Sequence, residues 1–334
     1  MIQYVLGVDG GNSKTDYYLF SSAGTMIDGL RAGTCSHEQF PDGFEAAGRE
    51  LSLSIHTLLS RNHLTIENIS AAAFGLAGAD HPDQKASLER VILGLGFTRF
   101  VVDNDGFLGV KAGCAKGYGL CCINGSGTVT VGIGADGKRL QVGGVGSELS
   151  GDEAGGFYLS RRIVRAVYDS FYRMGQKTAL AEPLFALLAV SESSALLQTV
   201  CALIAQRTFP TTDIMRLLFA SARDGDAVAQ QILRDCAQST ALSVLGCLSQ
   251  LYFPHDADIV LAGSVWVKTQ GSLLHTHFDA LVTAASPIPC HIHTLNEPPA
   301  TGAVLWALEL LHHQSLSSED ASHVFAQVNQ FLRT

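Results

Sequence analysis

Charged residues are scarce in this sequence, at 16% of 334 residues, whereas 47% of the residues are hydrophobic. This balance excludes an intrinsically disordered chain and provides ample material for buried cores. Lysine and arginine number 22 against 31 aspartates and glutamates, which gives a formal net charge of −9. An acidic chain repels polyanions, so we expect no nucleic-acid partner.

Long apolar runs and targeting segments are also missing. No run of 18 apolar residues occurs, so neither a transmembrane helix nor a membrane partner is expected. The first nine residues read as a strand without a basic segment, which argues against a secretory signal. The eight cysteines form no Cys-x-x-Cys pair, and we expect reduced thiols in a cytoplasmic protein.

Several common site motifs are absent as well. The chain has no Gly-x-x-x-x-Gly-Lys-Ser/Thr loop and no Gly-x-Ser-x-Gly elbow, and its first glycine turn lacks the Gly-x-Gly-x-x-Gly fingerprint. Close histidine pairs such as His275 and His277 lack a third ligand at a metal-binding spacing, so no zinc site is expected.

One local device occurs twice in the chain. A strand that ends at Asp9 is followed by a glycine turn and a second strand, and the same order recurs around residues 120–134. Helical spacing covers residues 42–61, 84–93, 154–174, 180–206, 213–222, 227–250, 273–284, 300–313 and 318–332. We therefore predict an α/β fold with two duplicated domains, residues 1–117 and 118–334, and a cleft between them.

The two turns are candidate phosphate sites. Ligands of open α/β sheets bind beyond the carboxyl ends of strands, and glycines allow backbone N–H groups to converge on a phosphate. A plain hairpin would explain either turn alone, but two facing turns favour a clamp on a triphosphate. The candidate residues are Asp9, Gly10, Gly11, Asn12, Ser13, Lys14 and Thr15 in the first turn, and Gly125, Ser126, Gly127 and Thr128 in the second.

Asp105 is the candidate catalytic residue. It follows a predicted strand over residues 100–103 and lies near the predicted domain junction. A carboxylate there can accept a proton from a hydroxyl that attacks phosphorus. The alternative is a helix N-cap, for which aspartate is favoured. Asp103, two residues earlier, is expected to serve the fold.

A glycine-rich loop over residues 143–151 leads to Asp152 and Glu153 at the start of a long predicted helix. Two interpretations remain open. The acidic residues can cap the helix and interact with its dipole. Alternatively, the loop backbone approaches a sugar while Asp152 accepts hydrogen bonds from sugar hydroxyls.

These segments resemble a known family. Residues 8–15, 125–128 and 261–266 are similar to the two phosphate motifs and the adenosine motif of the actin-like ATPase superfamily. Within it, the chain is identified as a member of the BadF/BadG/BcrA/BcrD ATPase family and is most similar to the N-acetylglucosamine kinases. The segments that carry this likeness are residues 33–37, 75–80, 104–106, 143–146 and 151–154.

The resemblance implies two ribonuclease H-like domains and ATP-dependent phosphorylation of an amino sugar, with N-acetylglucosamine converted to its 6-phosphate. It implies that Asp105 is the base, that Asp9 organises Mg²⁺ through water, and that Gly263 and Ser264 bind ATP. It also implies a homodimer. The sugar-binding residues that it implies are Ser36, His37, Gly78, Asp105, Gly144, Val145, Gly146, Ser147 and Asp152.

Three features leave the sugar open between N-acetylglucosamine, glucosamine and a related compound. Ser36 and Val129 replace asparagines of the animal kinases, and one extra residue lies between Gly146 and Gly151. Two other functions compete. One is an ATPase that activates a partner enzyme through an iron–sulfur cluster, for which Cys114 is the candidate ligand. The other is a sugar sensor that has lost catalysis.

Overall fold

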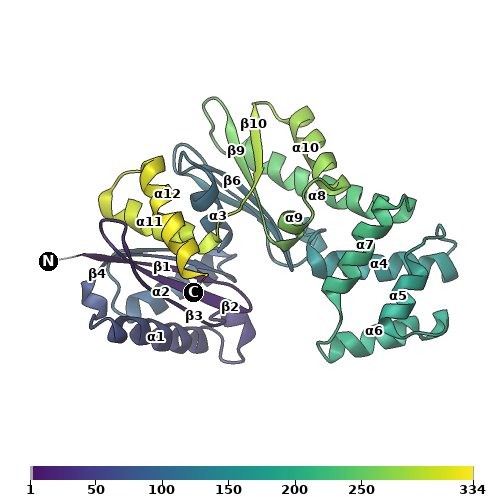
Figure 1. Ribbon diagram of the computed structural model, residues 1–334, viewed down its shortest axis with the longest axis horizontal. Coiled ribbons are helices and arrows are strands. Elements are labelled where there is room, and N and C mark those ends of the chain that lie inside the picture. The colour runs from purple at the N-terminus through teal and green to yellow at the C-terminus, as the bar shows by residue number, and fades with distance from the viewer. Residues whose placement is uncertain (1–2, 334) are drawn as a thin grey trace.

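The computed structural model describes residues 3–333; Met1 and Ile2, at the start of the predicted first strand, and Thr334 lie outside the described residues. The chain forms two α/β lobes side by side, with α3 (Gly106–Gly113) between them (Figure 1). Each lobe contains a five-stranded sheet.

The sheet of the first lobe has the order β3-β2-β1-β4-β5. Its strands are β1 (Tyr4–Gly10), β2 (Lys14–Ser21), β3 (Met26–Gly33), β4 (Ile69–Leu76) and β5 (Phe100–Asp103). Strands β1, β2 and β3 pair antiparallel, whereas β4 and β5 run parallel to β1. Alternate residues of each strand point to opposite faces, so both faces carry a buried apolar layer.

Two pairs of helices cover these faces. α1 (Phe44–Arg61) and α2 (Pro82–Gly94) pack against the side of β1 that carries Leu6 and Val8. α11 (Pro299–His312) and α12 (Ser318–Phe331) pack against the other side, where Val5 is buried. Figure 1 shows these C-terminal helices beside the N-terminal strands, although the two segments lie far apart in the sequence.

The second lobe repeats the design. Its sheet order, β10-β9-β6-β7-β8, is the order of the first sheet read from the other end. The strands are β6 (Gly119–Asn124), β7 (Thr128–Ile133), β8 (Arg139–Gly143), β9 (Ala257–Ala262) and β10 (Cys290–Thr294). Again three consecutive antiparallel strands are extended by two strands parallel to the first of them. The predicted α/β fold with two duplicated sheets is confirmed.

The helices of the second lobe agree largely with the predicted spans. They are α4 (Gly155–Tyr172), α5 (Ala181–Leu188), α6 (Leu196–Ala205), α7 (Thr211–Arg223), α8 (Ala227–Gln250), α9 (Ser264–Lys268) and α10 (Leu273–Ala285). The predicted single helix over residues 180–206 is divided into α5 and α6. Ala189 ends α5 in the left-handed conformation at φ 52°, and the serines after it favour turns and caps over helix interior.

No single helix within residues 3–333 has the length and apolar character needed to cross a membrane; α5 and α6 together, bent by 64°, meet the test by length and composition alone.

The predicted division at residue 117 coincides with the passage from one sheet to the other, but α11 and α12 pack on the first sheet. α11 also lies tightly against α3, because a Cβ on Gly302 would come within 2.0 Å of the Leu108 carbonyl oxygen. Whether residues 1–117 form a folding unit without these helices stays a prediction.

Candidate active site

A cavity of about 470 Å³ lies between the two lobes and contains both glycine turns. The carboxyl ends of β1, β4, β5 and β6 all reach it, as expected for ligand sites of α/β sheets. Its lining residues are Asp9, Gly11, Asn12, Ser13, Lys14, Asp16, Glu38, Ala77, Gly78, Asp80, Asn104, Asp105, Ile123, Gly125, Ser126, Gly127, Thr128, Val129, Gly144 and Gly263.

Both turns present unused backbone donors to this cleft. In the first turn, Gly11 N donates to Lys14 O at 2.9 Å, and no described residue accepts from the N–H groups of Asn12 and Ser13. In the second turn, Gly125 N donates to Gly127 O at 2.9 Å, while the N–H groups of Ser126 and Gly127 find no acceptor within residues 3–333. Converging free N–H groups of this kind bind phosphate oxygens.

Close packing explains two of the glycines around the second turn. Gly155, at the start of α4, has φ 81°, and a Cβ there would lie 2.6 Å from the carbonyl carbon of Gly127. Gly263 has φ 95°, and its Cβ would lie 2.6 Å from Asn124 O. Only glycine tolerates both the backbone conformation and the approach. The turn is therefore held between the start of α4 and the end of β9.

Asp105 lies at the N-cap position of α3 but makes no side-chain capping bond. Its neighbour Asn104 accepts from Gly106 N at 2.8 Å instead. The Asp105 carboxylate is thereby available to the cleft, which it lines. Burial, and then the nearby charge of Asp80, raise the pKa of Asp105 to about 6. Such a pKa suits a general base that works near neutral pH.

Asp9, at the end of β1, has an even more perturbed carboxyl group. Burial, and then the charges of Asp105 and Asp16, raise its pKa to about 8. Lys14 and Arg31 lie nearby, but both pair with Asp16, at 2.8 Å and 2.6 Å. Lys14 and Arg31 offset the raised pKa of Asp9 only in part, and neither forms an ion pair with it in the described chain. A cation in the cleft would stabilise the ionised form of Asp9.

These residues fit Mg²⁺ held with a nucleotide. Mg²⁺ commonly binds one or two carboxylates, substrate phosphates and several waters, without a cage made only of protein ligands. Within residues 3–333 no group of three or more His, Cys, Asp or Glu side chains could hold a metal ion by itself. A single carboxylate such as Asp9, which would contact Mg²⁺ through water, is consistent with an ion held mainly by nucleotide phosphates and waters.

Asp152 organises the loop over residues 143–151. Its Oδ2 accepts from Gly146 N at 2.8 Å, from Ser147 N at 3.3 Å and from Ser150 Oγ at 2.9 Å. Gly144 N donates to Oδ1 at 2.9 Å. The side chain is buried and does not line the cleft. Asp152 therefore shapes the loop backbone, and α4 has no side-chain cap; direct contact of Asp152 with a sugar stays a prediction.

Ser36 and His37 form a buried layer behind the first lobe's side of the cleft. The His37 ring stacks on Phe44 with centroids 4.0 Å apart, and burial lowers its pKa. A Cβ on Gly78 would come within 2.6 Å of His37 Cε1. The Ser36 hydroxyl and His37 Nδ1 are buried without a hydrogen-bond partner. These polar atoms lie next to Gly78, which lines the cleft.

Nine predicted site residues do not line the cleft directly. They are Gly10, Thr15, Ser36, His37, Val145, Gly146, Ser147, Asp152 and Ser264. Thr15 requires a correction, because its side chain is fully buried and cannot donate to a phosphate. It follows the exposed Lys14 on β2, and successive strand residues point to opposite faces, so Thr15 points into the core with Cys35 and Tyr17.

Sequence reasoning missed three carboxylates that line the cleft, Asp16, Asp80 and Glu38; Asp16 pairs with Lys14 and Arg31. Asp80 could have been found, because it follows β4 in the way that Asp105 follows β5. Glu38 had no such signal, since it lies in a one-turn helix (His37–Gln39) whose position depends on the packing of His37. Asp103, as predicted, serves the fold: it pairs with Lys85 at 3.0 Å and with Arg139 of the other lobe.

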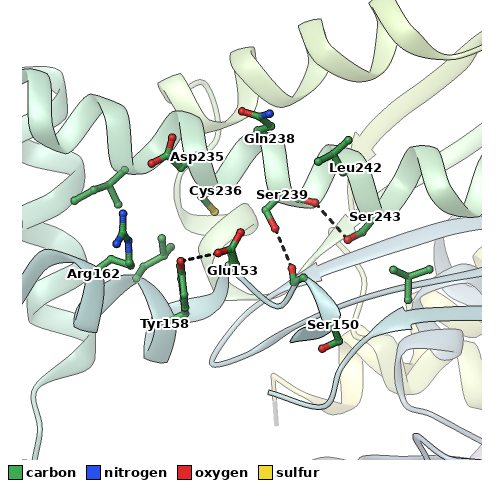
Figure 2. Close-up of a pocket in the computed structure, with 14 residues that line it drawn as sticks. Ser150, Glu153, Tyr158, Arg162, Asp235, Cys236, Gln238, Ser239, Leu242 and Ser243 are labelled. Carbon is green, nitrogen blue, oxygen red and sulfur yellow. Dashed lines mark hydrogen bonds between the residues drawn. The ribbon is translucent and has the colours of Figure 1, made fainter. Parts of the chain in front are cut away.

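A second pocket, of about 590 Å³, lies between α4 and α8, behind the loop that Asp152 organises. Figure 2 shows Ser239 of α8 pointing to this loop, where its hydroxyl donates to Gly151 O at 2.9 Å. Tyr158 and Glu153 bond across the same pocket. Neither glycine turn lines it, so it is not the triphosphate site. The bond from Ser239 shows that α8 supports the loop over residues 143–151.

Cys114, the candidate iron–sulfur ligand, is buried, and burial raises the pKa of its thiol far above the usual range. Its role as a cluster ligand stays a prediction. All eight cysteines are free, and none belongs to a metal-binding cluster in the described part of the chain.

Comparisons with known proteins agree with this architecture. The chain is 26% identical over 311 residues to the N-acetylmuramic acid/N-acetylglucosamine kinase of Clostridium acetobutylicum, covering 92% of this chain and 98% of that protein. A candidate N-acetylglucosamine kinase from Chromobacterium violaceum has a similar structure, with TM-score 0.68 and 20% identity, over 93% of this chain and 99% of the other.

A ROK-family glucokinase from Streptomyces griseus, solved with glucose and AMPPNP, also shares the fold, with TM-score 0.53 and 14% identity over 94% of this chain and 99% of the other. The model of the BadF/BadG/BcrA/BcrD ATPase family matches residues 6–307. The match spans both sheets and both glycine turns, which confirms the resemblance predicted from the motifs: this chain belongs to the BadF/BadG/BcrA/BcrD ATPase family.

Proposed function

We propose that this protein is an ATP-dependent kinase that phosphorylates a hydroxyl group of an amino sugar, with the 6-hydroxyl of N-acetylglucosamine as the leading acceptor. The proposal rests mainly on the position and the raised pKa of the Asp105 carboxylate. This carboxylate makes no capping hydrogen bond to α3, and its pKa is raised to about 6. It lies in a cleft between two turns whose N–H groups have no acceptor among residues 3–333. The relative from Clostridium acetobutylicum supports the choice of an amino sugar.

In the proposed reaction the sugar hydroxyl oxygen attacks the γ-phosphorus of ATP. The bond from that phosphorus to the β-phosphate oxygen breaks, the hydroxyl proton passes to the Asp105 carboxylate, and ADP leaves. The free N–H groups of Asn12, Ser13, Ser126 and Gly127 hold phosphate oxygens and stabilise the charge that develops on them. Mg²⁺ near Asp9, when bound, supplies positive charge to the phosphates. Closure of the lobes excludes water from the cleft.

The substitution Asp105→Asn tests the proposal. We expect kcat to fall by ~10²–10⁴, the range for loss of a general base, in an assay that couples ADP release to N-acetylglucosamine. Asp83→Asn, an exposed change on α2, is the matched control and should leave kcat unchanged. Stabilisation by MgATP should persist in Asp105→Asn, which shows that the site is intact.

Near-full sugar phosphorylation by Asp105→Asn would remove Asp105 from the mechanism. Sugar binding by the wild-type protein without sugar-stimulated ADP release would favour a sensor over a kinase.

Two further proposals accompany this one. The family resemblance supports a homodimer, which light scattering would test against a monomer of 35.4 kDa. Eight free cysteines support a location in the cytoplasm, where thiols stay reduced.

A further inference from the structure

Carboxylates predominate on the side of the cleft that we assign to the sugar, where no lysine or arginine from residues 3–333 lines the cavity. Five acidic side chains line the whole cavity, and Lys14 is the one lysine or arginine among its described lining residues. Lys14 pairs with Asp16 beside the first phosphate turn. We use the name acidic wall for Glu38, Asp80 and Asp105, the three carboxylates away from that turn.

The cations next to the acidic wall are engaged elsewhere. Lys85 and Arg139 both pair with Asp103, which lies outside the cavity lining. Arg31 pairs with Asp16. Burial lowers the pKa of His37, which lies behind Gly78, and so disfavours its charged form. Among residues 3–333, no lysine or arginine next to the acidic wall is therefore unpaired. The exposed His81, whose positive charge when protonated acts on Asp80, is the remaining candidate cation for an anionic substituent on the sugar.

Asp80 is fixed as an acceptor. Its Oδ1 accepts from Asn104 Nδ2 at 2.8 Å and from Gln141 Nε2 at 2.8 Å, one donor from each lobe. Gln141 also donates to Gly143 O at 3.1 Å, at the start of the glycine loop. Asp80 Oδ2 has no hydrogen-bond partner among residues 3–333, although the side chain is half-buried and lines the cleft. A positioned carboxylate oxygen of this kind accepts from hydroxyl, amide or ammonium groups.

We propose that Asp80 positions the sugar, and that the acidic wall selects a neutral or cationic amino sugar over one that carries a carboxylate. This inference rests on the proposed function. It separates N-acetylglucosamine and glucosamine, which lack an anionic group, from N-acetylmuramic acid, whose lactyl ether ends in a carboxylate. The relative from Clostridium acetobutylicum is named for both N-acetylated sugars, so the inference assigns this chain a narrower choice.

The physical basis is uncompensated repulsion in a confined site. Asp80 and Asp105 are close enough for the charge of Asp80 to raise the pKa of Asp105. A single sugar ring that places its hydroxyl at Asp105 brings any carboxylate on the ring near the same charges. Like charges at such a site cost binding energy unless a cation balances them. We expect kcat/KM for N-acetylmuramic acid to be lower by at least about tenfold, or about 1.4 kcal/mol.

The test measures kcat/KM for N-acetylglucosamine, glucosamine and N-acetylmuramic acid with the full chain and MgATP. Asp80→Asn and Glu38→Gln each remove one charge from the acidic wall, and Glu38 is exposed, so its variant should fold normally. We expect each change to reduce the preference for N-acetylglucosamine over N-acetylmuramic acid by roughly threefold or more, and added salt to reduce it in the wild type. Glu45→Gln, an exposed change on α1 outside the cleft, should leave the ratio unchanged.

Equal kcat/KM for the two N-acetylated sugars would overturn the inference. A preference that neither variant nor salt alters would also overturn it, because steric exclusion of the lactyl group would then be the cause. If none of the three sugars is phosphorylated, the proposed function fails, and this inference fails with it. Phosphorylation of N-acetylglucosamine together with rapid use of N-acetylmuramic acid would overturn the inference alone.

Discussion

The substitution Asp152→Asn separates two roles for this residue, a support of the glycine loop and a direct ligand of the sugar. The carboxylate accepts from the backbone N–H groups of Gly144, Gly146 and Ser147 and from the Ser150 hydroxyl. An asparagine has nearly the same shape, but one acceptor oxygen becomes an NH₂ group. That group cannot accept from the loop donors and would meet their hydrogens.

The cost follows from the bonds that are lost or weakened. A hydrogen bond to a charged group contributes about 1.5–3 kcal/mol. With its oxygen at the Oδ2 position, the asparagine keeps the three donors to Oδ2 without the negative charge and loses the Gly144 bond to Oδ1. Because the loop is partly open to water, which can replace some bonds, we expect a loss of about 2.5 kcal/mol in the free energy of unfolding. At about 2.1 cal/mol/K per residue, a cooperative transition of all 334 residues gives a decrease in Tm of about 4 °C.

Thermal unfolding and steady-state kinetics measure the two consequences together. If Asp152 supports the loop, Asp152→Asn lowers Tm and raises KM for the sugar, while KM for MgATP changes little, because the phosphate turns do not contact Asp152. Ser150→Ala serves as a graded control, since it removes one hydroxyl, which lies 2.9 Å from Asp152 Oδ2 and 2.8 Å from Ser147 O, and leaves the carboxylate in place. It should give a smaller change in the same direction.

A variant with the wild-type Tm and a greatly increased sugar KM would refute this reasoning. That result would mean that the loop keeps its shape without the carboxylate, and that Asp152 is mainly a ligand of the sugar.

Two further predictions concern the ionisation of the cleft carboxylates. Because Asp105 must be ionised to accept a proton and its pKa is raised to about 6, kcat should rise with pH through about 6 and be roughly tenfold lower at pH 5 than on the plateau; a flat profile between pH 5 and 8 would contradict its role as base. The folded-state pKa of Asp9 is raised from 3.8 to about 8, so the folded state binds more protons in that window and the unliganded protein loses stability as pH rises through it. Asp9→Asn should therefore raise Tm at pH 8 by about 2 °C or more, leave it nearly unchanged at pH 4, and weaken MgATP binding; a lower Tm at pH 8 would show that the carboxylate has a stabilising partner.

The duplicated fold was predictable from local patterns. The two strand–glycine turn–strand segments and the helical spacing around them depend on short-range backbone preferences, which the sequence states directly. The position of Asp105 after a buried strand also follows from local sequence, because strands end where the apolar run ends. The division of α5 from α6 was missed, since apolar residues keep helical spacing on both sides of Ala189 while the backbone leaves the helix there.

The residues of the sugar side show where local patterns fail. Asp152 follows Gly151 and Asp80 lies two residues after Gly78, and the local sequence does not say which carboxylate faces the cleft. In the structure, the Asp152 carboxylate turns to its own loop, whereas Asp80 is fixed by one amide from each lobe and retains a free oxygen. Such orientation depends on contacts between residues far apart in the chain.

The sequence by itself therefore determined the two sheets, the glycine turns and the carboxylates at the strand ends, because each follows from the order of neighbouring residues. Only the tertiary structure decided which polar groups remain unused once the two lobes meet. Gln141 reaches Asp80 and Arg139 reaches Asp103 because β8 of one lobe lies against the strand ends of the other. Those contacts leave without a partner among residues 3–333 the N–H groups of Asn12, Ser13, Ser126 and Gly127 and the Oδ2 atom of Asp80.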